Sequence, residues 1–259
     1  MPPSSRNEVP AIVVEGLTKQ FGDKVAVEDL SFQVQPGTFF GFLGPNGAGK
    51  STTMQMLAGL MRPTRGSIRI AGLDVAREPL TVKGLLGIVP EELPLYDRLT
   101  GEEYLDLAAR LYGLSRSAGR QRAEELLQFL DLAQSRATLV ADYSMGMKKK
   151  LALAAALIHD PQLLLLDEPL NGVDPISARV VSDLLRKLAA RGTTVFFTSH
   201  VLDVVERLCD EVGIIHQGRL VAQGTIAAIR ASQDDARLED AFLALVSADV
   251  SRGDLSWVT

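Results

Sequence analysis

The sequence predicts an α/β fold that combines a parallel sheet with a small antiparallel β subdomain and an inserted helical subdomain. Three observations support this fold class. Apolar runs typical of buried strands alternate with helical segments, which favours a parallel sheet with right-handed crossovers. Residues 11–18 and 25–34 instead alternate apolar and polar side chains, as half-buried strands do. Between about Leu80 and His159 the pattern becomes helical.

The antiparallel subdomain is expected from the first part of the chain. A turn at Gly22-Asp23 separates the first two strands, and residues 66–72 alternate again as a third. Residues 1–10 have no apolar core and no cleavage pattern, so we expect a disordered lead-in and not a signal peptide.

The most informative stretch runs from Phe39 to Thr53 and reads FFGFLGPNGAGKSTT. An apolar strand leads through a glycine-rich turn into a helix, and the turn fits the pattern G-x-x-x-x-G-K-[ST]. Such a turn points backbone N–H groups at phosphate oxygens, and the helix adds its positive N-terminal end. Lys50 is placed to reach the β- and γ-phosphates, and the Ser51 hydroxyl can bind Mg²⁺. A merely flexible turn needs only glycine, so the pattern predicts a P-loop NTPase (RecA-like) core that binds a nucleoside triphosphate.

The helical subdomain is expected at about residues 85–160. Within it, Thr100 and Glu103 have the spacing of a capping box at the start of a helix. The three helices expected there span Leu99–Tyr112, Gln121–Leu130 and Met147–His159.

The α/β pattern resumes after this insertion. Expected in order are a strand, a helix, a strand, a helix and a hairpin, at 162–167, 175–190, 193–198, 201–209 and 211–223. We therefore expect one domain over residues 11–224. A C-terminal helical extension is expected over 225–259, with two short helices in 225–246 and a fraying tail after them.

Two acids and a histidine end the strands of this second part. The run LLLLD ends in Asp167 with Glu168 next to it, and VFFTSH ends in His200. Carboxyl ends of parallel strands meet at one edge of a sheet, beside the P-loop. Asp167 is then expected to bind Mg²⁺, either directly or through a water ligand of the ion, and Glu168 to polarise an attacking water as a general base. Alone, the two acids would be read as a strand cap and the histidine as a structural residue.

Composition excludes several classes of function. The 259 residues carry a net charge of −5, which gives no general electrostatic reason to bind nucleic acid or an anionic membrane surface. The single cysteine, Cys209, excludes an intrachain disulfide and is expected to be buried and not nucleophilic. No apolar run approaches the roughly 20 residues of a membrane span. For work at a membrane, we expect other chains to supply the spans.

The ordered set of motifs resembles the ATPases of the ABC family, the nucleotide-binding subunits of ATP-binding-cassette transporters. GPNGAGKST resembles Walker A, LLLLDEP resembles Walker B, NGVD at 171–174 resembles the D-loop, and TSH carries the switch histidine, His200. The resemblance implies ATP and Mg²⁺ as cofactors and ATP hydrolysis as the activity. The Walker A residues that it implies as nucleotide contacts are Gly44, Pro45, Asn46, Gly47, Ala48, Gly49, Lys50, Ser51 and Thr52.

A less regular stretch, YSMGMKKKL, occupies the position of the family's signature loop. Ser144 and Gly146 match the usual LSGGQ pattern, and Tyr143, Met145 and Met147 depart from it. The resemblance implies that Ser144 and Gly146 contact the γ-phosphate bound by a second subunit, which suits a helix N-terminus. Lys148 and Lys149, which follow, are expected to be solvated.

Two further positions carry the resemblance with a change of residue. Phe21 stands where the family places an aromatic side chain, usually tyrosine, that stacks on adenine. Glu91 stands where a glutamine is usual in the Q-loop, and a carboxylate there is expected to contact the nucleotide and to bind metal. The choice of ATP over GTP rests on the resemblance, with modest support from the absence of an N-K-x-D motif.

The resemblance also implies partners. Two cassettes, either identical or related, would close head-to-tail over two Mg·ATP and drive a separate integral membrane permease. The surface around Glu92–Leu99 is expected to receive that permease, and Leu238–Val246 resembles the end of exporter ATPases of the ABC-2 class. This arrangement implies a cytoplasmic protein, peripheral on the inner face of the cell membrane. The alternative is a soluble ABC-type ATPase that remodels ribosomes or DNA, and a P-loop metabolite kinase is a third reading.

Overall fold

The computed structural model describes residues 9–232 and 237–246. Its centre is a six-stranded sheet in the order β10-β9-β3-β8-β7-β6. Strands β9, β3, β8, β7 and β6 pair in parallel, and β10 is antiparallel to β9. The bounds, in sheet order, are Arg219–Thr225, Glu211–His216, Phe39–Leu43, Thr194–Ser199, Leu163–Asp167 and Leu86–Val89.

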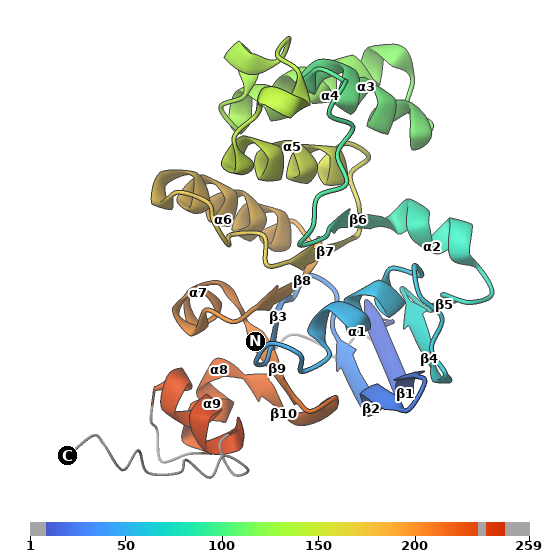
Figure 1. The fold of residues 1–259 in the computed structure, drawn as a ribbon, viewed down its shortest axis with the longest axis vertical. Helices are drawn as coiled ribbons and strands as arrows, with labels where there is room; N and C mark the ends of the chain where they lie inside the picture. Colours follow the sequence, from blue (N-terminus) through green and yellow to red (C-terminus); the bar gives the residue numbers. More distant parts are fainter. Residues whose placement is uncertain (1–8, 233–236, 247–259) are drawn as a thin grey trace, which may run out of the picture.

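The second sheet is antiparallel, in the order β2-β1-β4-β5. It lies to one side of the central sheet, with helix α1 (Lys50–Leu57) beside it (Figure 1). Its strands, in sheet order, span Lys24–Val34, Ile12–Phe21, Arg65–Ile70 and Leu73–Asp74. Both sheets agree with the α/β class and the antiparallel β subdomain predicted from the sequence, so these predictions are confirmed.

Aromatic packing joins the two sheets. Phe32 of β2 lies against Phe40 and Phe42 of β3 and Phe196 of β8, with ring centroids 5.7–6.0 Å apart. All four rings are buried, and each such ring removes a large apolar area from water. The P-loop strand β3 is therefore fixed from both sides, because its other face packs against a second apolar cluster.

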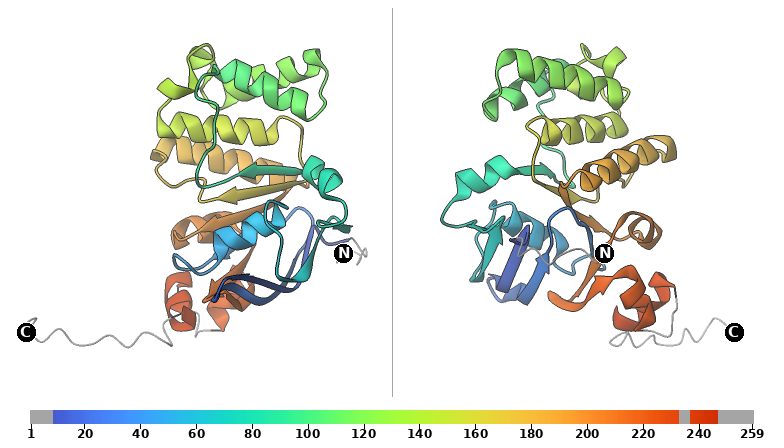
Figure 2. Two further views of the ribbon diagram at one scale, coloured as in Figure 1. Left: turned by 45° about the vertical axis from the view of Figure 1, so that its right-hand side comes forward. Right: turned by 180° about the vertical axis from the view of Figure 1, so that it is seen from behind.

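Three helices gather at one end of the molecule, as the views in Figures 1 and 2 agree. They are α3 (Gly101–Leu111), α4 (Arg116–Phe129) and α5 (Met145–Leu157), with short 3₁₀ turns η1 (Ala133–Ser135) and η2 (Val140–Asp142) before α5. The predicted capping box is confirmed, because the Thr100 side chain accepts from the Glu103 N–H and Glu103 accepts from the Thr100 N–H.

The prediction of helix throughout Leu80–His159 is wrong at β6. Helix α2 (Pro79–Leu85) is followed at once by this strand, which forms the edge of the central sheet next to β7. Its sequence LGIV is a short apolar run, and periodicity cannot distinguish a buried strand of that length from helix. The inserted helices therefore begin only after the chain has left the sheet.

The remaining elements follow the predicted order. Helix α6 (Pro175–Ala190) has the predicted bounds, α7 spans Leu202–Leu208, and the hairpin of β9 and β10 is present. The two expected terminal helices are α8 (Ile226–Ala231) and α9 (Leu238–Val246). Residues 1–8 of the lead-in predicted at 1–10, and the tail at 247–259, lie outside the described residues. In the part of the chain that the structure describes, no helix combines the length and the apolar character needed to cross a bilayer.

Candidate functional site

The P-loop lies at the carboxyl end of β3 and leads directly into α1. Gly44 and Gly49 fit there because they have no side chain: a Cβ would stand 2.3 Å from the Ile215 carbonyl oxygen at Gly44, and 2.7 Å from that of Ala26 at Gly49. Gly49 also has a φ of 108°, in the left-handed region that favours glycine. The loop is thus pressed against β9 and β2, with its N–H groups at the start of α1.

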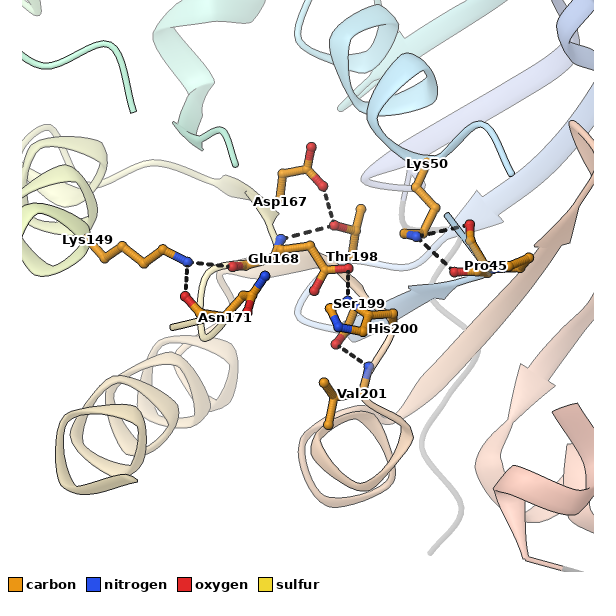
Figure 3. Close-up of polar contacts among 11 residues, drawn as sticks. Pro45, Lys50, Lys149, Asp167, Glu168, Asn171, Thr198, Ser199, His200 and Val201 are labelled. Carbon is orange, nitrogen blue, oxygen red and sulfur yellow. Dashed lines mark hydrogen bonds and ion pairs between the residues drawn. The ribbon is translucent and has the colours of Figure 1, made fainter. Parts of the chain in front are cut away.

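Lys50 is the buried cation of this loop. Its Nζ donates to the carbonyl oxygens of Gly44 at 2.8 Å and Pro45 at 3.3 Å (Figure 3). Burial lowers the pKa of the Lys50 ammonium, and the nearby carboxylates oppose that shift. The carboxylates that oppose it are Glu168, Asp167 and Glu91. A buried ammonium beside the loop N–H groups makes a binding site for a polyphosphate.

Asp167 and Glu168 follow one another at the end of β7 but point to different partners. The Thr198 hydroxyl donates to Asp167 Oδ1 at 2.5 Å and accepts from the Glu168 N–H at 3.1 Å. Glu168 Oε1 lies 2.9 Å from His200 Nδ1. Both acids are 6% exposed. One threonine therefore contacts the Asp167 carboxylate and the Glu168 backbone, while the Glu168 carboxylate lies beside the histidine (Figure 3).

These groups share one cleft with a volume of about 720 Å³. The cleft gathers side chains that are far apart in the sequence. Its lining includes Phe21, Asn46, Gly47, Gly49, Lys50, Ser51, Thr52, Glu91, Asp167, Glu168, Asn171 and His200. The lining offers an aromatic ring together with a cation, hydroxyls and carboxylates. That combination suits a nucleotide, whose base can stack and whose phosphates need charge neutralisation.

The two more unusual residues are both in this cleft. Phe21 ends β1, its side chain is half exposed, and the Lys19 ammonium lies 5.0 Å from the centre of its ring. Glu91 is exposed in the bend after β6. A group of three or more acid, histidine or cysteine side chains suited to a metal is absent from residues 9–232 and 237–246. Within the cleft, the Ser51 hydroxyl and the carboxylates of Asp167 and Glu91 are oxygen donors of the kind that Mg²⁺ prefers.

Ser144 and Gly146 are not part of this cleft. Ser144 caps α5, since its hydroxyl accepts from the Met147 N–H at 3.3 Å, and it is exposed. The preceding Tyr143 is buried and donates its hydroxyl to the Ser135 carbonyl oxygen at 2.8 Å, which fixes the loop to the helical subdomain. The start of α5 is therefore exposed and lies outside the lining of the cleft of the same chain.

The prediction that Lys149 is solvated is wrong. Its side chain is buried, and its Nζ donates to the carbonyl oxygens of Glu168, at 3.0 Å, and of Asn171 (Figure 3). Lys148, also expected to be solvated, is partly exposed and forms an ion pair with Asp97 at 3.4 Å. The helical periodicity of the sequence could have indicated this burial. Lys149 lies on the same face of α5 as the buried Leu153 and Ala156, which follow it by four and seven residues.

Thr198 is the other residue that sequence reasoning missed. It is fully buried in β8, in register with Asp167 of β7. The available signal was a Thr-Ser pair at the carboxyl end of the otherwise apolar strand VFFTS. The Thr198 hydroxyl reaches Asp167 because β7 and β8 pair in this register, and the sequence of either strand alone does not show that pairing.

Comparison with known proteins agrees with a cleft that binds a nucleotide. The sequence profile described as ABC transporter matches residues 27–171. The linearmycin resistance ATP-binding protein LnrL of Bacillus subtilis (strain 168) is 41% identical over 211 residues, which are 82% of this chain and 68% of that protein. The Nod factor export ATP-binding protein I of Paraburkholderia xenovorans (strain LB400) is 40% identical over 223 residues, covering 86% and 73%. A solved ATP-binding subunit of an ABC transporter superimposes with a TM-score of 0.86 at 35% identity, covering 91% and 99%.

Proposed function

The chain belongs to the ABC transporter family of ATPases, and we propose that its hydrolysis of ATP drives a separate membrane permease that exports a substrate. The proposal rests above all on the cleft that gathers Lys50, Asp167, Glu168 and His200, whereas Ser144 at the start of α5 is exposed and outside its lining. Such a site is complete only when a second cassette supplies the missing contacts. The export direction is supported by relatives whose names describe resistance and export.

Each side chain has a role that follows from its position. Phe21 stacks on adenine, and Lys50 with the loop N–H groups from Gly44 to Thr52 neutralises the phosphates. Ser51 and Asp167 would hold Mg²⁺, which supplies further charge neutralisation at the β- and γ-phosphates. The Glu91 carboxylate lines the same cleft, and we assign it to the nucleotide and to Mg²⁺ as well. The second subunit contributes Ser144 and Gly146 to the γ-phosphate.

The chemical step is carried by Glu168 and His200. Glu168 accepts a proton from the water that attacks the γ-phosphate, as a general base. His200 holds the Glu168 carboxylate through Nδ1, at 2.9 Å, and keeps its other ring nitrogen for the γ-phosphate. With its side chain 46% exposed, His200 can reach a ligand in the cleft.

Replacing the proposed base tests the mechanism. Glu168→Gln keeps the size of the side chain and removes its basicity, so ATP hydrolysis should fall by about 10²- to 10⁴-fold. Binding of ATP should persist, and the variant should accumulate as a closed dimer with ATP. Steady-state ATPase assays, with nucleotide titration and size-exclusion chromatography, measure these effects. Hydrolysis at the wild-type rate would exclude Glu168 as the base.

The same variant tests the partners. We assign the chain to the inner face of the cell membrane, bound to an ABC-2 type permease through the surface around Glu92–Leu99, with no nucleic acid. Glu168→Gln purified with ATP from detergent-solubilised source cells should bring a multi-span membrane protein with it. Recovery of ribosomes or DNA without a membrane protein would instead support a soluble remodelling factor.

A further inference from the structure

Glu168 has a backbone conformation that its surroundings must maintain. Its φ is 47°, in the left-handed region that a residue with a side chain rarely adopts. Such a conformation costs free energy and persists where neighbouring groups fix it. It also sets the direction in which the carboxylate leaves the end of β7. The contacts of the Glu168 backbone therefore decide where this carboxylate lies.

Those contacts come from three places. The Glu168 N–H donates to the Thr198 hydroxyl at 3.1 Å, and the Glu168 carbonyl oxygen accepts from the Asn171 N–H at 3.1 Å. The same carbonyl oxygen accepts from Lys149 Nζ at 3.0 Å, and Lys149 also donates to the Asn171 carbonyl oxygen. Lys149 thus closes the turn of residues 168–171 from outside, at both of its ends (Figure 3).

Lys149 is an unusual residue for this task. Burying an ammonium costs free energy, and burial lowers the pKa of the Lys149 ammonium, opposed by the charges of Glu168 and Glu91. Its two hydrogen bonds to carbonyl oxygens and these two carboxylates compensate that cost. Lysine is the fifth residue of α5, about one turn beyond the N-cap Ser144. Helix α5, which begins at the exposed signature loop, is thereby hydrogen-bonded to Glu168, the proposed general base of the same chain.

We propose that Lys149 is a positioning residue that holds Glu168 in the conformation needed for general-base catalysis. This inference rests on the role proposed for Glu168, and it adds a residue outside the nucleotide cleft to the catalytic arrangement. Without Lys149, the 168–171 turn loses the donor that bridges its two carbonyl oxygens. Glu168 then samples other backbone conformations, while Lys50, Ser51 and Asp167 keep their contacts with the phosphates.

A double-mutant cycle tests the proposal. Lys149→Met keeps an unbranched side chain of similar length and removes the ammonium. We expect kcat to fall by about 10- to 100-fold, as for other small displacements of catalytic groups, with KM and the Kd for ATP within about twofold of wild type. In the Glu168→Gln background the same substitution should cause no further loss, because the group that it positions is already disabled. Single-turnover assays with radiolabelled ATP measure the slow residual rates.

The neighbouring lysine supplies the control. Lys148→Met removes an ammonium from the same turn of α5, where among the described residues its ion pair is with the exposed Asp97, and should leave kcat unchanged. If Lys149→Met does not fold, Lys149→Arg takes its place in the cycle. It keeps hydrogen-bond donors but sets them farther from the helix, so kcat should again fall only when Glu168 is present.

Three results would overturn the proposal. They are an unchanged kcat in Lys149→Met, an equal loss of kcat in both backgrounds, and a loss that appears in the Kd for ATP instead of kcat. These outcomes differ from failure of the proposed function, which would appear as wild-type hydrolysis by Glu168→Gln alone.

Discussion

Thr198 shows how a single buried hydroxyl contacts both acids that we propose for the ATPase site. It donates to Asp167 and accepts from the Glu168 N–H, so its loss leaves a buried donor and a buried acceptor without their partner. Thr198→Val, which is nearly isosteric, should lower the free energy of unfolding by about 1–3 kcal/mol and also reduce kcat. Urea unfolding and ATPase assays measure both. Thr198→Ser, which keeps the hydroxyl, should stay near wild type, and equal behaviour of the two variants would contradict this role.

His159 gives a second prediction at the scale of one residue. Its ring stacks on Tyr112, its Nε2 lies 3.0 Å from the Leu86 carbonyl oxygen, and its buried Nδ1 has no hydrogen-bond partner among the described residues. Burial, the largest cause, lowers the pKa of the His159 imidazole, and Arg122 adds to this, whereas the Leu86 bond and Asp160 oppose it.

Since the folded state binds the His159 proton less readily than the unfolded state, His159 favours folding above pH 6.5 and loses that effect as the pH falls through its lowered pKa. His159→Gln keeps an N–H for the Leu86 carbonyl oxygen and does not titrate. As the pH falls from about 7 through the lowered pKa of His159, the urea midpoint of the variant should therefore fall less than that of the wild type. If the urea midpoints of the two proteins changed in parallel with pH, His159 would not contribute to the pH dependence of stability.

At the scale of elements, the sequence was most informative where a local rule decides the structure. The start of α3 is such a case, because Thr100 and Glu103 satisfy each other's N–H groups within one turn. Strand β6 was missed because its place depends on pairing with β7, a long-range contact. The burial of Lys149 was missed for a similar reason, since its partners are carbonyl oxygens about 20 residues further along the chain.

The capping box leads to a direct prediction for α3. Thr100→Ala removes the side chain that accepts from the Glu103 N–H, and should lower the free energy of unfolding by about 1 kcal/mol. Thr100→Ser keeps the acceptor and should cost much less. Chemical denaturation of the three proteins measures the difference. Equal stability of Thr100→Ala and the wild type would mean that α3 does not depend on its cap.

At the scale of the whole molecule, the central claim is that one ATP site is built from two chains. The sequence alone predicted both halves, because the P-loop and the signature loop are contiguous motifs. It did not establish that they lie apart in one chain, which depends on how α5 packs on the sheet. In the structure most of the residues predicted to bind ATP line a common cleft, and Ser144 is exposed outside it.

Mixing two defective chains tests this claim most directly. Lys50→Ala should fail to hold ATP but keep an intact signature loop. Gly146→Asp keeps the P-loop and adds a negative charge where the γ-phosphate of the second chain is expected. At Gly146 only Ser144 Oγ lies near an added Cβ, at 4.0 Å, so the substitution leaves the fold intact. Each mixed dimer then contains one intact composite site.

The measurement is the ATPase rate of the mixture against the rates of the two variants alone, at matched total protein. We expect the mixture to hydrolyse ATP faster than the sum of the rates of the two variants alone. A control mixture of Gly146→Asp with the double variant Lys50→Ala/Gly146→Asp should show no such gain. A mixture of the first two variants that is no more active than its components would contradict a site shared between two chains.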